Sequence, residues 1–362
     1  MTFLLLALLA SSVITLWVVH SAKTHAHLSN DHDLSGPQKF HAFPVPRIGG
    51  VGIVGGIAMV AALVAWRQSG GMMALGLVVC GLPAFIAGLT EDLTKNVSPR
   101  RRLVATALSA ALAAWFLGAV ISRTDIPGLD TVVSFRWGAI ALAVFVVAGV
   151  ANAVNIVDGF NGLASMCGVM MLSSIAYVAV QVGDPLLASL ALAGVGAVLG
   201  FFVWNFPAGL IFLGDGGAYF LGFYIAELAI LLVQRNAAVS PIFPLLLCVY
   251  PIFETLFSIY RKKFIRGMSP GVPDGVHFHM LVYKRLMRWA VGNRNAKELT
   301  RRNSMTSPYL WLLCMLAVVP AVLWWDDTAV LTVFIFLFAF TYVALYWKIV
   351  RFKSPRWLVF RR

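Results

Sequence analysis

Long apolar runs dominate the chain, and charged or turn-rich residues interrupt them at short intervals. A membrane-spanning helix needs roughly 17 to 25 mostly apolar residues, and eleven segments of this kind can be separated. The pattern therefore predicts an all-α, polytopic integral membrane protein with about eleven transmembrane helices. We expect them near residues 3–19, 48–66, 72–89, 103–121, 137–154, 163–181, 186–203, 217–233, 241–260, 309–325 and 329–347.

The composition excludes a soluble globular enzyme. Hydrophobic residues make up 60% of the 362 residues and charged residues only 12%, whereas a soluble domain has about 45–50% apolar and about 25% charged residues. The four cysteines lie inside apolar runs without paired spacing, so we expect packing residues and no metal or redox site. The stretch 3–19 has neither a preceding basic residue nor a cleavage motif, which predicts a retained first helix.

Basic residues lie mainly on one side of the predicted topology. With the N-terminus outside, 24 of the 28 Lys and Arg residues fall in segments that face inward. The positive-inside bias then predicts a cytoplasmic C-terminus. We expect one membrane-embedded domain, 1–362, because no linker divides the chain. The inward segments are the loops 20–47, 90–102, 155–162, 204–216 and 261–308, which would form an active face, and a basic tail, 348–362.

Three motifs that combine glycine with acidic residues interrupt the apolar background on the predicted cytoplasmic face. Residues 88–92 (GLTED) close the third span, residues 152–164 (NAVNIVDGFNGLA) follow the fifth, and residues 212–217 (FLGDGG) precede the eighth. A lone Asp-Gly pair is usually an ordinary turn. Three such motifs on one face indicate a site for a polar ligand.

The spacing within these motifs suggests which side chains meet. Asn152, Asn155 and Asp158 are three residues apart, so on a helix they follow one side, and Asn161 adds a further amide. They suit a ligand with several donors and acceptors, although asparagine also joins membrane helices to one another. Asp215 stands among glycines at a helix start, where backbone N–H groups bind phosphate and a carboxylate can hold Mg²⁺.

Two further patches carry chemistry with less specific patterns. Arg47 precedes a glycine-rich helix start and could meet a phosphate or a nucleobase, or could be an interfacial anchor. His277 and His279 precede a basic run. The histidine pair and this run together could bind a diphosphate or transfer a proton, or the segment could be a solvated loop. Glu227 and Glu254 fall within predicted spans and receive no role, since either could be a helix-packing residue.

In this order and on this face, the motifs resemble those of the polyprenyl-phosphate N-acetylhexosamine-1-phosphate transferases, from Pro44 to about Leu286. The resemblance implies transfer of a sugar 1-phosphate from a UDP-N-acetylhexosamine to undecaprenyl phosphate, with UMP as the leaving product. It implies Mg²⁺ as the cofactor, with Mn²⁺ as an alternative, and a cytoplasmic active site in the bacterial inner membrane. No nucleic-acid partner is expected, and a homodimer stays open.

The lack of a three-histidine run argues against the peptidoglycan branch of this family. The short outer loops and the Arg47 patch are more similar to the branch that initiates O-antigen and other surface polysaccharides. Sugar choice would lie in the loop 261–308. The chain departs from the family pattern in three ways. Glu91 stands where Asp is usual, and Asn161 stands where Asp is frequent. Ala218 follows Gly217 where many members have Ser, and the histidine motif ends in Met280 where another histidine is found.

The resemblance also implies roles for individual residues. Glu91 and Asp92 match an acidic pair that binds metal or acts on the lipid phosphate, and Asp158 is a catalytic and metal-binding candidate. Asp215 would be the Mg²⁺ ligand, and Phe212 would stack on uracil. The general base stays open between Asp92, Asp158 and an unaided attack by the ionised lipid phosphate. The other substrate-binding candidates are Arg47, Asn152, Asn155, Asn161, Asn205, His277 and His279.

Two other classes of protein fit parts of the pattern. A transporter or lipid flippase also has many spans and intramembrane polar groups, but it predicts inverted repeats with paired broken helices, and no such repeat is evident in the sequence. A catalytically inactive scaffold of the same fold would keep the motifs without turnover.

Overall fold

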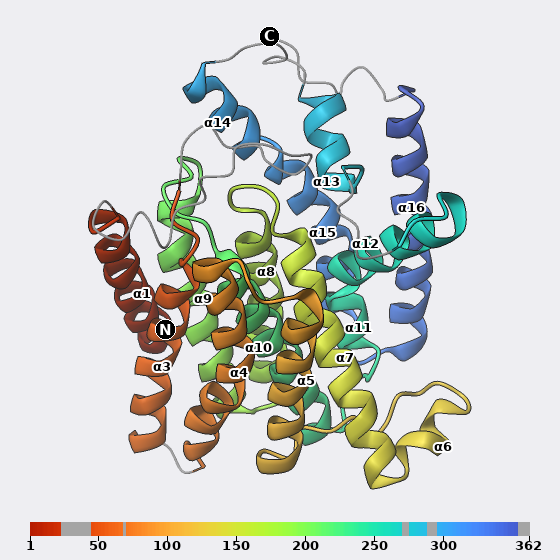
Figure 1. Ribbon diagram of the computed structural model, residues 1–362. Coiled ribbons are helices and arrows are strands. Elements are labelled where there is room, and N and C mark those ends of the chain that lie inside the picture. The colour runs from red at the N-terminus through yellow and green to blue at the C-terminus, as the bar shows by residue number, and fades with distance from the viewer. Residues whose placement is uncertain (23–44, 68–69, 270–274, 288–294, 354–362) are drawn as a thin grey trace.

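The computed structural model describes residues 1–22, 45–67, 70–269, 275–287 and 295–353, which form helices joined by mostly short loops (Figure 1). The predicted loop 20–47 and the tail 348–362 lie largely outside the described residues, as do two parts of the loop 261–308. The long helices run side by side, with α1 at one edge of the bundle and α16 at the other (Figure 1). The short helices α13 and α14 lie at one end of the bundle, and α6 lies at the opposite end (Figure 1).

The first half of the chain contains α1 (Thr2–His20), α3 (Gly50–Arg67), α4 (Met72–Thr94), α5 (Pro99–Phe116), α6 (Leu129–Val133), α7 (Arg136–Val157) and α8 (Leu163–Gln181). The second half contains α9 (Pro185–Asn205), α10 (Gly214–Arg235), α11 (Phe243–Leu247), α12 (Val249–Tyr260), η1 (Arg261–Ile265), α13 (Phe278–Leu281), η2 (Val282–Leu286), α14 (Ala296–Ser304), α15 (Ser307–Leu323) and α16 (Thr328–Val350).

The all-α, polytopic membrane architecture predicted from the sequence is confirmed. Nine helical stretches among the described residues are long and apolar enough to cross a membrane. Two of the eleven expected segments do not meet that criterion: α5, which starts with three arginines, and residues 241–260. The count of eleven and the orientation stay predictions.

The break inside residues 241–260 has a local cause. Instead of one helix, this stretch forms α11 and α12, which meet at Cys248. Pro251 has no N–H for the carbonyl of Leu247, and its ring would clash with that carbonyl in a continuous helix. In the first turn of α12 a proline is tolerated, so the helix restarts just before it.

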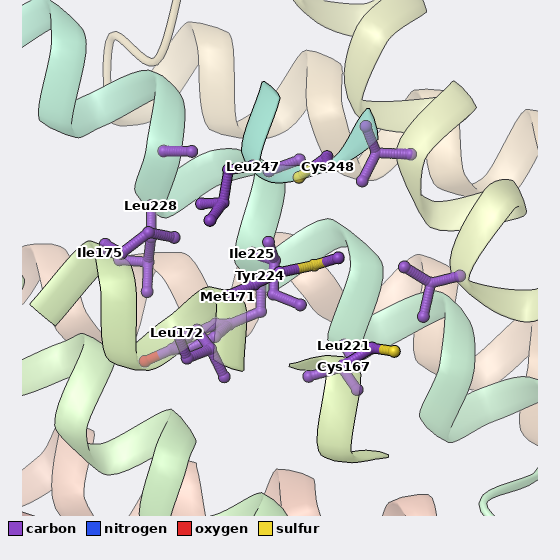
Figure 2. Close-up of a cluster of buried hydrophobic side chains, with 14 of the residues drawn as sticks. Cys167, Met171, Leu172, Ile175, Leu221, Tyr224, Ile225, Leu228, Leu247 and Cys248 are labelled. Carbon is purple, nitrogen blue, oxygen red and sulfur yellow. The ribbon is translucent and has the colours of Figure 1, made fainter. Parts of the chain in front are cut away.

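Helix α10 occupies the centre of the bundle. Its apolar window is completely buried, and it packs chiefly against α4 and α7, with further contacts to α3 and α8. Figure 2 shows part of this core, where Tyr224, Ile225 and Leu228 of α10 lie near Met171 and Leu172 of α8. All four cysteines of the chain are buried and free, as expected of packing residues.

Glycines let the start of α10 approach its neighbours at backbone contact. A Cβ on Gly50 would lie 2.4 Å from Cα of Gly217, and one on Gly88 would lie 2.5 Å from N of Gly216. Gly214 has a φ of +74°, which only glycine adopts without strain. These contacts bring the ends of α3, α4 and α10 together, so that Asp92 and Asp215 meet.

Candidate active site

A pocket of about 400 Å³ opens at the end of the bundle where α13 and α14 lie. Its walls come from α4, α5, α7, α9, α10, α13, α14 and the segments that connect them. Ten of the twelve residues predicted from the sequence line this pocket: Arg47, Glu91, Asn155, Asp158, Asn161, Asn205, Phe212, Asp215, His277 and His279. The fold thus gathers side chains from six separate parts of the sequence into one site.

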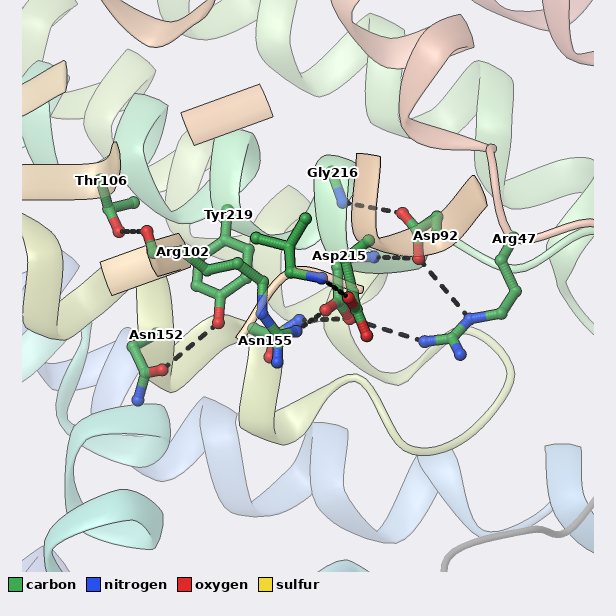
Figure 3. Close-up of polar contacts among 11 residues, drawn as sticks. Arg47, Asp92, Arg102, Thr106, Asn152, Asn155, Asp215, Gly216 and Tyr219 are labelled. Atoms are coloured by element: carbon green, nitrogen blue, oxygen red, sulfur yellow. Dashed lines mark hydrogen bonds and ion pairs between the residues drawn. The ribbon is translucent and has the colours of Figure 1, made fainter. Parts of the chain in front are cut away.

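Asp215 is the centre of the polar contacts in the pocket (Figure 3). It lies in the first turn of α10, where Asn155 Nδ2 donates to its Oδ1 at 3.1 Å. Arg47 Nη2 lies 3.5 Å from the same oxygen, and Arg102 forms an ion pair with Oδ2. Two guanidinium groups therefore surround one carboxylate, and the site can hold anions as well as a cation.

Asp92 binds the backbone at the start of α10. Its two carboxylate oxygens accept hydrogen bonds from the backbone N–H groups of Asp215, at 2.9 Å, and Gly216, at 3.0 Å. Arg47 Nε lies 3.6 Å from Asp92 Oδ1, and the Asp92 side chain is only 1% exposed. Asp92 is not among the residues that line the pocket, so the contacts place it as a cap of α10, and its catalytic role stays a prediction.

Within each of two motifs, one residue lines the pocket and its partner does not: Glu91 lines it and Asp92 does not, while Asn155 lines it and Asn152 does not. Glu91 lines the pocket, while its Oε2 accepts a hydrogen bond from the N–H of Val97 at 2.7 Å. Asn152 does not line the pocket, because it lies a turn before Asn155 on α7, and its Oδ1 faces the hydroxyl of Tyr219 at 3.5 Å (Figure 3). The row predicted along one side of α7 therefore reaches the pocket only from Asn155 onward.

Asp158 follows the last residue of α7 and lines the same pocket as Asp215. Burial raises the pKa of its carboxyl group to about 7, against the opposing effect of Arg47. A carboxyl group that exchanges its proton near neutral pH suits either a cation ligand or a proton acceptor.

The amide of Asn205 holds the backbone around the pocket. Its Oδ1 accepts from the N–H of Gly162 at 2.6 Å, and its Nδ2 donates to the carbonyl of Ile211 at 2.7 Å. Asn205 thus joins the turn after α7 to the segment before α10. Its predicted role in nucleotide binding stays a prediction, and these bonds give it a positioning role.

Helix α14 secures the other side of this turn. Asn303 Oδ1 accepts from the N–H of Asn161 at 2.9 Å, and Asn161 Nδ2 donates to Ser304 Oγ at 3.1 Å. Asn303 itself lines the pocket. Sequence reasoning missed it because its partner lies 142 residues away in a different motif.

Arg102 is a second residue that the sequence did not single out. It stands in a run of three arginines at the start of α5, and nothing in the run shows which member turns inward. In the structure its guanidinium contacts Asp215 and lies over the ring of Tyr219, 5.8 Å from the centroid.

The two predicted histidines stack at the wall of the pocket. Their rings are parallel within 4°, with centroids 5.3 Å apart. Burial lowers the pKa of His279 to about 3, although Glu254 opposes the shift, so this ring is neutral in the physiological range. His277 also contacts Glu254, for which the sequence pattern predicts no role.

The acidic residues fit a divalent cation that is shared with a substrate. No cluster of three His, Cys, Asp or Glu side chains in the described part of the chain could hold a metal by itself. Asp215 and Asp158 both line the pocket, however. Mg²⁺ is usually held by one or two carboxylates together with substrate phosphates, and this donor set meets that requirement.

Comparison with known proteins identifies related sequences. A sequence model of glycosyl transferase family 4 matches residues 74–233. The chain is 30% identical over 259 residues to a probable undecaprenyl-phosphate N-acetylglucosaminyl 1-phosphate transferase of Bacillus subtilis, covering 71% of this chain and 70% of the relative.

Two further relatives extend the comparison. The undecaprenyl-phosphate alpha-N-acetylglucosaminyl 1-phosphate transferase of Thermotoga maritima is 28% identical over 252 residues, covering 70% of this chain and 72% of the relative. A phospho-N-acetylmuramoyl-pentapeptide-transferase of Bacillus anthracis is 34% identical over 159 residues, covering 41% and 49%.

Proposed function

Because the chain belongs to glycosyl transferase family 4, we propose that it transfers an N-acetylhexosamine 1-phosphate from a UDP-sugar to undecaprenyl phosphate. An oxygen of the lipid phosphate attacks the phosphorus next to the sugar, the bond to UMP breaks, and a polyprenyl-diphosphate-sugar forms. The reaction initiates a cell-surface polysaccharide such as an O-antigen. Similarity to the relatives from Bacillus subtilis and Thermotoga maritima supports N-acetylglucosamine as the first sugar to test.

The observation that carries the proposal is the mixed charge of the pocket around Asp215. Both substrates are polyanions, so bringing two phosphates together requires positive charge at the reacting centre. Arg47 and Arg102 lie on either side of the Asp215 carboxylate and can pair with phosphate oxygens. The pocket therefore offers both cationic donors and carboxylate oxygens within one small space.

We propose Mg²⁺ as the cofactor, with Asp215 and Asp158 as its ligands and Mn²⁺ as an alternative. When bound, the ion would neutralise charge on the diphosphate and stabilise the leaving UMP. The residues of the chain supply the positioning: Asp92 fixes the start of α10 and hence Asp215, and Asn155 orients the Asp215 carboxylate. Asp158 can accept a proton at its carboxylate if the lipid phosphate arrives protonated.

The bundle supports a multi-pass protein whose pocket opens at one membrane face. We propose that this face is cytoplasmic and that the membrane is the bacterial inner membrane. The reason is that 24 of the 28 Lys and Arg residues lie in the segments that are expected to face inward.

A transfer assay tests the proposal. Purified protein in detergent is mixed with undecaprenyl phosphate, Mg²⁺ and each of a panel of labelled UDP-N-acetylhexosamines, and both UMP and lipid-linked label are measured. We expect both products from at least one donor, no turnover after chelation, and a loss of about 100-fold or more in Asp215→Asn.

Asp326→Asn provides the matched control, because Asp326 is an exposed acid in the turn between α15 and α16, away from the pocket. It should retain full activity. Folded wild-type protein that turns over no donor would contradict the proposed function and favour the inactive scaffold or the transporter.

A further inference from the structure

Glu254 is a buried acid whose hydrogen bonds point to the pocket wall. It lies on α12, is 1% exposed, and a carboxylate at such a depth is strongly unfavourable unless several donors satisfy it. His277 Nδ1 lies 3.1 Å from Oε1, and the N–H of Phe278 donates to the same oxygen at 3.0 Å. The hydroxyl of Tyr342, on α16, donates to Oε2 at 2.8 Å.

The positions of these donors in the chain distinguish two roles for Glu254, one in joining helices and one in holding the pocket wall. A glutamate that only joined membrane-spanning helices would bond to groups on those helices. Here two of the three donors belong to residues 277 and 278, the segment that carries the predicted histidine motif to the pocket. The third donor, Tyr342, fixes the carboxylate itself and is packed against Phe253 and Phe278, with ring centroids 5.0 Å away in each case.

The contacts determine which nitrogen of His277 a ligand can meet. A carboxylate that accepts from Nδ1 places a proton on that nitrogen and leaves Nε2 for the ligand. Stacking on His279 holds the plane of the ring. His277 lines the pocket, so Nε2 is the ring nitrogen that a substrate can contact.

A second anchor keeps the same segment in place. The guanidinium of Arg261 donates to the carbonyl of Val276 at 2.9 Å and to the hydroxyl of Tyr346 at 2.7 Å. Tyr346 lies one turn after Tyr342 on α16. The last membrane helix thus supports the histidine segment through both tyrosines.

We propose that Glu254 is a positioning residue for the transferase reaction: it holds Nδ1–H of His277 so that Nε2 faces the diphosphate of the sugar nucleotide, and Tyr342 orients Glu254 for this task. The inference rests on the proposed function for the identity of the substrate. It adds a contact chain from α16 through α12 to the pocket wall.

The test is a double-mutant cycle with Glu254→Gln and His277→Gln in the transfer assay. In the wild-type background, Glu254→Gln should lower kcat/KM for the UDP-sugar by about 10- to 100-fold and leave the KM for undecaprenyl phosphate within about 2-fold. In the His277→Gln background the same change should lower kcat/KM by less than about 3-fold, because the group it positions is gone. Losses that multiply in the double variant would overturn the proposal.

Two further variants separate positioning from stability. Tyr342→Phe keeps the carboxylate and removes one donor, so it should fold and lower donor kcat/KM by about 3- to 10-fold, again only when His277 is present. Glu227→Gln removes an acid that is equally buried, 1% exposed, on α10 away from the pocket. It should leave donor kcat/KM unchanged, and a loss equal to that of Glu254→Gln would contradict a specific role.

A readout without turnover distinguishes this proposal from the proposed function. In protein labelled with ¹⁵N in its histidine rings, the signals of His277, assigned by their loss in His277→Gln, should show a proton on Nδ1. A neutral ring with its proton on Nε2 would overturn the positioning role even if the enzyme is active. Conversely, the expected ring state in a protein that turns over no donor would leave the Glu254 contact in place and refute only the reaction.

Discussion

Asp158 holds its carboxyl group where burial opposes ionisation, in the same pocket as Asp215. With a pKa of about 7, the folded protein keeps a proton on this group at mildly acid pH. An incoming divalent cation must displace that proton, because only the carboxylate is a ligand. Cation binding should therefore be linked to pH through this one residue.

The linkage predicts how Mg²⁺ stabilises the protein. Below pH 7 the concentration of Mg²⁺ needed for half of the thermal stabilisation should rise by up to about 10-fold per pH unit, as expected for exchange of one proton. Above pH 8 it should level off. The measurement is the unfolding temperature in detergent as a function of Mg²⁺ at pH 5.5, 7 and 8.5, with the UDP-sugar donor present because its phosphates would complete the ligand set.

Asp158→Asn is the control for this titration, since an amide carries no such proton. It should bind Mg²⁺ more weakly at pH 8.5 and lose most of the pH dependence. Equal midpoints at all three pH values in the wild-type protein would refute Asp158 as the linked ligand.

Individual site residues differ in how well the sequence could predict them. Asp215, Asn155 and Asp158 stand in motifs whose glycines and polar residues have no place in an apolar span, so the sequence marks them. Arg102 is hidden in a run of similar residues, and Glu254 has partners 23 and 88 positions away. Such contacts depend on how distant helices pack, which one sequence does not reveal.

At the scale of elements, the junction of α3, α4 and α10 depends on glycines. A Cβ on Gly88 would lie 2.5 Å from N of Gly216 and 2.6 Å from C of Asp215, both backbone atoms that cannot rotate away. Helices α4 and α10 would have to move apart. That movement would pull Asp92 away from the N–H groups it caps.

Gly88→Ala should therefore destabilise the protein by about 1–3 kcal/mol and lower transfer activity by more than the loss of folded protein explains. The matched control is Gly149→Ala on α7, where an added Cβ has nothing within 4 Å; it should be neutral or slightly stabilising. Thermal unfolding and initial transfer rates of both variants check this. Wild-type behaviour of Gly88→Ala would refute the close approach.

The helices themselves were largely predictable, whereas their ends and breaks were not. Apolar runs identify α7, α8 and α10 because lipid and a buried core both select such residues. Residues 241–260 are apolar throughout, so hydropathy alone predicts one span, while the position of Pro251 breaks it. Helix α4 continues to Thr94, beyond the predicted end at 89, which places Glu91 and Asp92 on the helix.

At the scale of the whole molecule, the pocket and the predicted inward loops lie at the same end of the bundle. Arg301, on α14, belongs to that end, and Asp326 lies in the turn between α15 and α16. Both residues are exposed. If the positive-inside bias is correct, they lie on opposite sides of the membrane.

Single cysteines introduced as Arg301→Cys and Asp326→Cys test the orientation in bacterial cells. A membrane-impermeant maleimide should label the second variant in intact cells and the first only after permeabilisation. The unmodified protein is the control and should stay unlabelled, because its four cysteines are buried. The reverse labelling pattern would invert the topology and place the pocket outside.

The complete burial of the apolar window of α10 also has a consequence for biosynthesis. Helices α3, α4, α5, α7, α8 and α9 all contact α10, and all of them are translated before it. Helix α10 carries Asp215 and Glu227, groups that are unfavourable in contact with lipid. The helices that are synthesised first therefore surround α10, which carries Asp215. The earlier part of the chain thus shields the acidic residues of this later helix from lipid.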